Sequence, residues 1–221
     1  MPERYNVPKR IRGLIFDIDN TLYENPEYIR EQVEGLIRRL AGELGRDENE
    51  LTEEIDTVRR QRSVEDGGRR PSLGTTFKEY YDVSIAKSVG WREELMEPER
   101  FLSVDSELRG RLESLSVRLA LCAVTNNPLS IGRRTLAALG ISDLLPVASG
   151  LDTCAVSKPS PRPFELALEF LAVPPTEVLA IGDRYEIDLE PIVDLGGGGA
   201  LVGGRDDLLS LLDGLLEDSL G

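Results

Sequence analysis

The chain has 221 residues, of which 40% are hydrophobic and 30% charged, so it can bury the core of one large domain or of a domain with an insert. Its formal net charge of −14 argues against a nucleic acid polymer or an anionic membrane as a bulk partner. It contains no histidine, which excludes catalytic triads that use histidine and metal sites that have histidine ligands.

The cysteine count and the lack of a recognisable signal peptide bear on the cellular compartment that we expect for the protein. Two cysteines, Cys122 and Cys154, are too few for a disulfide framework, and no signal peptide is evident. No apolar run approaches the roughly 20 residues that span a bilayer. We therefore expect a cytoplasmic protein that has no membrane partner; its oligomeric state is not readable from the sequence.

The first ten residues predict a loose arm, and a short apolar run follows them. Leu14 to Phe16 predict a strand buried on both faces, as in a parallel sheet. Asp17 and Asp19 come next, and their i, i+2 spacing sends both carboxylates to one side of an extended backbone. Because adjacent carboxylates repel, a bound cation is the usual remedy. The alternative is a buried strand that ends in a polar turn.

From Glu24 to Val104 the periodicity is helical, with no convincing strand. This predicts a helical insert, residues 24–104, within an α/β core made of 1–23 and 105–221. In chain order we expect a helix that starts at Asn25-Pro26 and stops before Gly45, a second around Leu51 to Val58, a glycine-rich loop from Ser63 to Thr75 that carries Arg69 and Arg70, and a third helix from Phe77 to Val89 capped by Thr76.

After the insert, strand and helix patterns alternate. This alternation predicts a doubly wound parallel sheet, in which ligands bind at the carboxyl ends of the strands. The expected strands are Leu119–Val124, Leu145–Ala148, Val178–Ile181 and Ala200–Val202, and the expected helices are Glu107–Leu115, Ile131–Leu139, Arg162–Leu171, Ile187–Leu195 and Leu208–Leu216.

Polar residues stand where these strands end. They are Asp17 and Asp19, Thr125 and Asn126, and Asp183, with Lys158 on a nearby loop. Several of these residues, and Asp188 further along the chain, each have a simpler explanation when taken alone. Thr125 can be a polar strand terminus, Lys158 a solvated lysine, Asp183 a turn residue, and Asp188 an acid stabilised by a helix dipole.

Four motifs in this order resemble those of the haloacid dehalogenase-like hydrolase superfamily, over the whole chain. They are Asp17-Ile18-Asp19-Asn20-Thr21, Thr125 at a strand end, Lys158, and Gly182-Asp183 with Asp188 five residues further on. The insert lies where that family places its helical type 1 cap. The resemblance implies a Rossmann-like core and phosphate-ester hydrolysis.

The resemblance also implies a role for each residue. Asp17 would attack phosphorus to form an aspartyl-phosphate, and Asp19 would protonate the leaving oxygen and then activate water. Mg²⁺ would bind Asp17, the Asp19 carbonyl and Asp183, with Asp188 as an outer or water-mediated ligand. Thr125, the Asn126 amide and Lys158 would hold phosphoryl oxygens, with Lys158 also neutralising the nucleophile.

The substrate is expected to be a small phosphorylated metabolite, such as a nucleotide or a sugar phosphate. Asn20-Thr21-Leu22-Tyr23 resembles the pyrimidine 5′-nucleotidase-like and related small-phosphatase branches. Two alternatives stay open: a phosphomutase of the same superfamily, and a non-catalytic protein that binds phosphate or a partner. The sequence departs from the family at Leu189 to Ile192. In the glycine run 196–199, Gly196 stands where the family usually has glycine, but Gly197 to Gly199 are expected to be unusually flexible.

Overall fold

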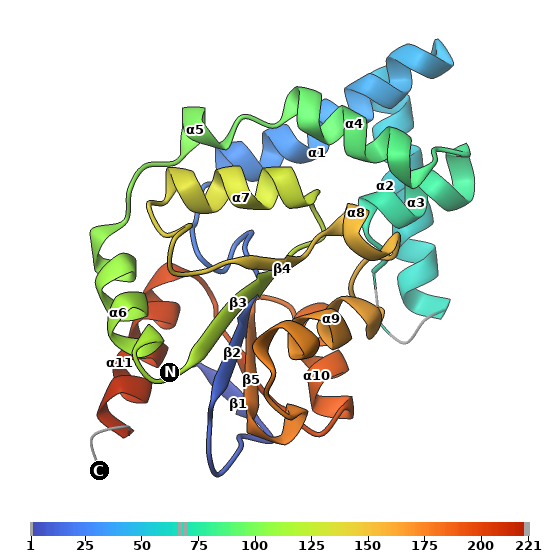
Figure 1. The fold of residues 1–221 in the computed structure, drawn as a ribbon. Helices are drawn as coiled ribbons and strands as arrows, with labels where there is room; N and C mark the ends of the chain where they lie inside the picture. Colours follow the sequence, from blue (N-terminus) through green and yellow to red (C-terminus); the bar gives the residue numbers. More distant parts are fainter. Residues whose placement is uncertain (1, 66–67, 69, 219–221) are drawn as a thin grey trace. The chain divides into compact units, whose positions relative to one another are not determined.

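The computed structural model describes residues 2–65, 68 and 70–218, which form two compact units (Figure 1). The first unit combines residues up to Asn25 with those from Pro98 onward, and the second is the segment Pro26–Glu97. The chain therefore returns to the first unit just before α5 (Pro98–Phe101), which is part of that unit. Within that first unit, Asn25 Nδ2 donates to the Phe101 carbonyl at 2.8 Å and so ties the outgoing segment to the returning one.

The first unit is built on one six-stranded sheet among the described residues, which confirms the predicted α/β class. Its order is β1-β6-β5-β2-β3-β4, and all neighbours are parallel except β1 and β6. The strands are β1 (Glu3–Tyr5), β2 (Gly13–Phe16), β3 (Ala120–Val124), β4 (Val147–Ser149), β5 (Val178–Gly182) and β6 (Gly198–Leu201).

The central strand β2 sets the position of the polar residues. All four of its residues are buried, because parallel neighbours flank it and helices cover both faces of the sheet. Phe16 is level with Ala123 of β3 and with Ile181 of β5. The three strands therefore end together, and the residues that follow them share one edge.

Helices cover both faces of this sheet (Figure 1). On one face α9 (Arg162–Leu171) and α10 (Glu190–Asp194) close an apolar cluster that includes Ile15, Phe164 and Ile192. On the other face α6 (Ser106–Ser116) and α11 (Arg205–Asp218) lie side by side. The first unit also contains α7 (Leu129–Ala138), α8 (Leu151–Cys154), a 3-10 turn (Pro175–Glu177) and a π-helical segment (Tyr185–Leu189).

The second unit is helical, and the ends of its helices correct two expectations. It contains α1 (Pro26–Leu44), α2 (Glu48–Glu65), α3 (Leu73–Tyr81) and α4 (Ile85–Leu95). The predicted third helix is two helices, because Asp82 takes a left-handed conformation (φ 54°) and ends α3. The caps are Ser72 and Ser84; Thr76 is buried inside α3, where its hydroxyl donates to the Ser72 carbonyl.

The terminal parts of the sheet correct two further expectations. The predicted loose arm contains β1, which pairs antiparallel with β6 from Glu3 to Tyr5. The glycine run is ordered in its second half, since Gly198 and Gly199 lie inside β6, where a Cβ would stand 2.6 Å from Pro8 Cδ and 2.9 Å from Leu189 Cβ respectively. Close packing explains these two glycines. None of the helices described is both long enough and apolar enough to cross a bilayer.

Candidate active site

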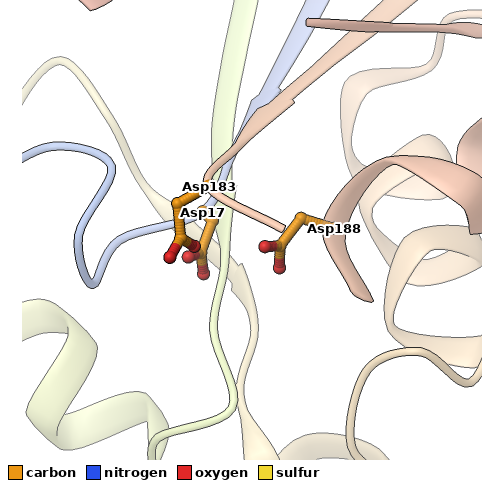
Figure 2. Close-up of side chains that lie close together, drawn as sticks. All are labelled: Asp17, Asp183 and Asp188. Atoms are coloured by element: carbon orange, nitrogen blue, oxygen red, sulfur yellow. The ribbon is translucent and has the colours of Figure 1, made fainter. Parts of the chain in front are cut away.

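Three of the predicted site residues follow three adjacent strands. Asp17, Thr125 and Asp183 come directly after β2, β3 and β5, and Asp188 lies in the π-helical segment that follows β5. The Asp17 amide donates to the Ile181 carbonyl at 2.9 Å, which extends the ladder and fixes the Asp17 backbone. Figure 2 shows the carboxylates of Asp17, Asp183 and Asp188 lying close together.

Lys158 lies among these carboxylates and is 1% exposed. Its Nζ donates to Asp17 Oδ1 at 2.5 Å, to Asp188 Oδ1 at 2.6 Å and to the Val124 carbonyl at 3.2 Å. Three acceptors satisfy the three donors of the ammonium group. Lys158, which the sequence places on a loop, is thus a buried cation. It joins the ends of β2 and β3 to the segment after β5.

The charges in this cluster do not balance. Burial and, secondly, the neighbouring Asp188 raise the pKa of Asp17 to about 7, against the opposing effects of Lys158 and Arg184. Desolvation lowers the pKa of Lys158, but Asp17 and Asp188 outweigh it, so the net shift is upward and the lysine stays charged. Lys158 and Arg184 supply two positive charges against the three carboxylates of Asp17, Asp183 and Asp188, so excess negative charge remains.

The excess negative charge of this cluster suits the binding of a divalent cation. Oxygen atoms of Asp17, Asp183 and Asp188 lie within 4.8 Å of one another. Asp183 Oδ1 is buried and has no hydrogen-bond partner among the described residues, although the guanidinium of Arg184 stands 3.5 Å away. Carboxylate oxygens are the hard ligands that Mg²⁺ prefers. The donor set and its charge therefore fit Mg²⁺.

Gly182 permits the approach of Asp188 to this cluster. A Cβ on Gly182 would stand 2.4 Å from Asp188 Cβ and 2.9 Å from its Cγ. Asp188 is further fixed by the Arg184 amide, which donates to its Oδ2 at 3.2 Å. Both Asp188 oxygens therefore already accept hydrogen bonds from protein groups, which leaves Asp183 the more open ligand.

Asp19 is the predicted site residue whose carboxylate the structure places outside this cluster. Its Oδ1 accepts from the Tyr23 hydroxyl at 2.5 Å and its Oδ2 from Asn127 Nδ2 at 3.0 Å. Tyr23 belongs to the Asn20-Thr21-Leu22-Tyr23 segment noted in the sequence, but neither Tyr23 nor Asn127 was predicted to bind Asp19. The signals available were the i, i+4 spacing of Tyr23 from Asp19 and the position of Asn127 in the polar run after β3.

Thr125 and Asn126 support their surroundings. The Thr125 hydroxyl accepts the Asn127 amide at 3.0 Å. The Asn126 side chain binds the backbone of Lys158 at two points: its Oδ1 accepts from the Lys158 amide at 2.7 Å and its Nδ2 donates to the Lys158 carbonyl at 3.2 Å. Asn126 therefore holds the loop from which the Lys158 side chain reaches Asp17.

Comparisons with known proteins identify the family of the chain. The phosphoglycolate phosphatase of Pectobacterium atrosepticum is 30% identical over 179 residues, 78% of this chain and 72% of that protein. The N-acetylmuramic acid 6-phosphate phosphatase of Pseudomonas putida is 29% identical over 85% of this chain and 80% of its own. A HAD phosphatase structure from Thermococcus onnurineus has a TM-score of 0.57 and 25% identity, covering 85% of this chain and 84% of that one. The family model of haloacid dehalogenase-like hydrolases matches residues 11–196, and the chain belongs to that family.

Proposed function

We propose that this chain is a Mg²⁺-dependent phosphomonoesterase that hydrolyses a small phosphorylated metabolite through an aspartyl-phosphate on Asp17. The observation that carries the proposal is the buried Lys158 shared by Asp17 and Asp188, beside an Asp183 oxygen that has no hydrogen-bond partner among the described residues. Relatives that are named phosphatases, and that match this chain over most of their length, support the same chemistry.

In the first step a carboxylate oxygen of Asp17 attacks phosphorus, and the bond from phosphorus to the leaving oxygen breaks. The leaving oxygen takes a proton from Asp19. Lys158 is held 2.5 Å from Asp17 Oδ1 and would offset charge on the nucleophile and the phosphoryl group. Thr125 and the amide of Asn126 would hold phosphoryl oxygens.

In the second step Asp19 accepts a proton from water as the water oxygen attacks phosphorus. The bond between phosphorus and Asp17 breaks, which releases phosphate and restores the carboxylate. Asp17, Asp183, the Asp19 carbonyl and Asp188 would hold Mg²⁺, with Asp188 acting through water because both its oxygens are already hydrogen-bonded. Bound Mg²⁺ would supply neutralisation of phosphoryl charge.

The test is turnover of p-nitrophenyl phosphate with Mg²⁺, and again after EDTA treatment. We expect phosphate release that EDTA abolishes and added Mg²⁺ restores. Activity undiminished by EDTA contradicts the metal. Phosphoryl transfer to a sugar acceptor without phosphate release favours the phosphomutase, and tight phosphate binding without turnover favours the non-catalytic protein.

We also propose that the helical unit Pro26–Glu97 acts as a cap that selects the substrate. The proposal rests on its insertion between the first motif and the second, since the core motifs offer no group to recognise a leaving alcohol. Arg69, on the predicted loop from Ser63 to Thr75, lies outside the described residues. Arg70 is exposed and pairs with Asp56 at 2.6 Å, and Tyr80 is also exposed.

Substrate choice can be tested in the cap. A screen of 2-phosphoglycolate, sugar phosphates and nucleoside monophosphates identifies the best metabolite. Arg70→Ala or Tyr80→Ala is expected to lower kcat/KM for that metabolite far more than for p-nitrophenyl phosphate. Equal losses on both substrates, or none, would exclude these residues as selectors.

The cytoplasmic location stays a prediction.

A further inference from the structure

Asp19 is held at both carboxylate oxygens by side chains that lie outside the four motif positions. Tyr23 donates to Oδ1 at 2.5 Å and Asn127 donates to Oδ2 at 3.0 Å. A carboxylate with one donor on each oxygen is restricted in rotation about its last bond. We call this group of three residues the Asp19 clamp.

Tyr23 reaches Asp19 because the chain turns back between them. The Thr21 and Leu22 amides both donate to the Ile18 carbonyl, at 3.3 and 3.0 Å, and Asn20 takes a left-handed conformation (φ 59°). The turn brings the backbone of Tyr23 beside that of Asp19 in an isolated β-bridge. The Tyr23 side chain is 4% exposed, so its hydroxyl donates from a shielded position.

Asn127 approaches from another element and is fixed by its own backbone. Its amide donates to Thr125 Oγ1 at 3.0 Å, and its carbonyl accepts from the Leu151 amide at 3.0 Å. The side chain is 6% exposed. Gly150 keeps this contact open, since a Cβ there would lie 2.9 Å from the Asn127 carbonyl oxygen. The clamp thus joins the turn after β2 to the loop after β3.

We propose that Tyr23 and Asn127 are positioning residues that aim the Asp19 carboxyl for its two proton transfers. The inference rests on the proposed function. A general acid must keep one oxygen within hydrogen-bond reach of the leaving oxygen, and a misplaced acid loses its effect. Asp19 is partly exposed, while both clamp partners are buried, so the carboxyl is held by shielded side chains.

The test compares two leaving groups. p-Nitrophenolate departs without a proton, whereas the alkoxide of β-glycerophosphate needs one. For Tyr23→Phe we expect kcat/KM to fall by about tenfold or more with β-glycerophosphate and by less than about threefold with p-nitrophenyl phosphate. The matched control is Tyr5→Phe, which removes a tyrosine hydroxyl bonded to the exposed carboxylate of Glu3 and should change neither value.

A double-mutant cycle shows whether Tyr23 acts through Asp19. In an Asp19→Asn background, Tyr23→Phe should cause no further loss with β-glycerophosphate. Additive losses, or equal losses on both substrates, would overturn the inference. If Tyr23→Phe fails to fold by circular dichroism, Asn127→Ala tests the clamp from its other oxygen with the same expectations.

The two proposals fail in different ways. If the wild type hydrolyses neither substrate, the proposed function fails and the clamp with it. If the wild type hydrolyses both and Asp19→Asn loses β-glycerophosphate selectively, the proposed function stands. A Tyr23→Phe variant that then behaves like wild type on both substrates overturns the clamp alone.

Discussion

Lys158 is important for the stability of the site, because removing it leaves the buried carboxylate of Asp17 without its ion-pair partner and that of Asp188 with Arg184 alone. We expect Lys158→Met to lower the free energy of unfolding by about 3–5 kcal/mol in EDTA, measured by urea denaturation. The control is Lys87→Met, which breaks an exposed ion pair with Glu43 and should cost less than about 1 kcal/mol. Similar small losses for both variants would show that Lys158 does not balance buried charge.

Asp17 is the proposed nucleophile, and an amide of nearly the same shape cannot replace it. Asp17→Asn should abolish turnover of p-nitrophenyl phosphate while the circular dichroism spectrum stays native. A variant that keeps more than about a tenth of wild-type kcat, a cost below roughly 1.4 kcal/mol, would contradict covalent catalysis by Asp17.

Asp17 also gives stability a pH dependence of known sign. Burial and Asp188 raise its pKa from 3.8 to about 7, so between these values the folded protein holds a proton that the unfolded chain has released. The free energy of unfolding contributed by this group therefore falls as pH rises through that window. In EDTA, wild-type stability minus that of Asp17→Asn should decrease from about pH 5 to about pH 8. A constant difference would contradict the raised pKa.

At the scale of elements, β5 must end in a residue without a side chain. In Gly182→Ala the new Cβ would fall 2.4 Å from Asp188 Cβ and push that residue away from Lys158. We expect a loss of about 1–3 kcal/mol in unfolding free energy, together with reduced kcat. Gly110→Ala in α6, where a Cβ has nothing within 4 Å, should be neutral or stabilising by up to about 1 kcal/mol. Wild-type values for Gly182→Ala would show that Asp188 can move freely.

The hydrophobic pattern predicted the long elements well, and short-range chemistry decided the rest. Arg162–Leu171 has the predicted bounds, because proline near its start and an apolar stripe both point to the same helix. β1 could not be predicted, since Glu3 to Tyr5 are stabilised by pairing with β6 rather than by their own pattern. The break at Asp82 depends on one left-handed residue, and nothing in the helical spacing indicates it.

The same distinction holds within the candidate site. Buried runs locate strand ends, so the shared edge of Asp17, Thr125 and Asp183 follows from the sequence. The partners of Asp19 do not follow, because they depend on the turn from Ile18 to Leu22 and on which way its side chains face. Likewise, the sequence gives no reason for the Asn126 side chain to bind the Lys158 backbone 32 residues away.

At the scale of the whole molecule, the net charge of −14 opposes the approach of a phosphorylated substrate. Salt screens this long-range field, with a Debye length of about 10 Å at 0.1 M. At fixed free Mg²⁺, kcat/KM for p-nitrophenyl phosphate should therefore rise with added NaCl, while kcat at saturation stays constant. A fall in kcat/KM would show that the cations near Asp17 dominate the encounter.

The burial of Lys158 has a practical consequence for handling the protein. The chain has four lysines; three of them, Lys9, Lys78 and Lys87, are exposed, and the fourth lies under the surface between two carboxylates. Acylating reagents attack the neutral amine, which Lys158 rarely offers because its ammonium form is stabilised there. Dyes, biotin or a solid support can thus be attached through the three outer amines while the fourth keeps its charge.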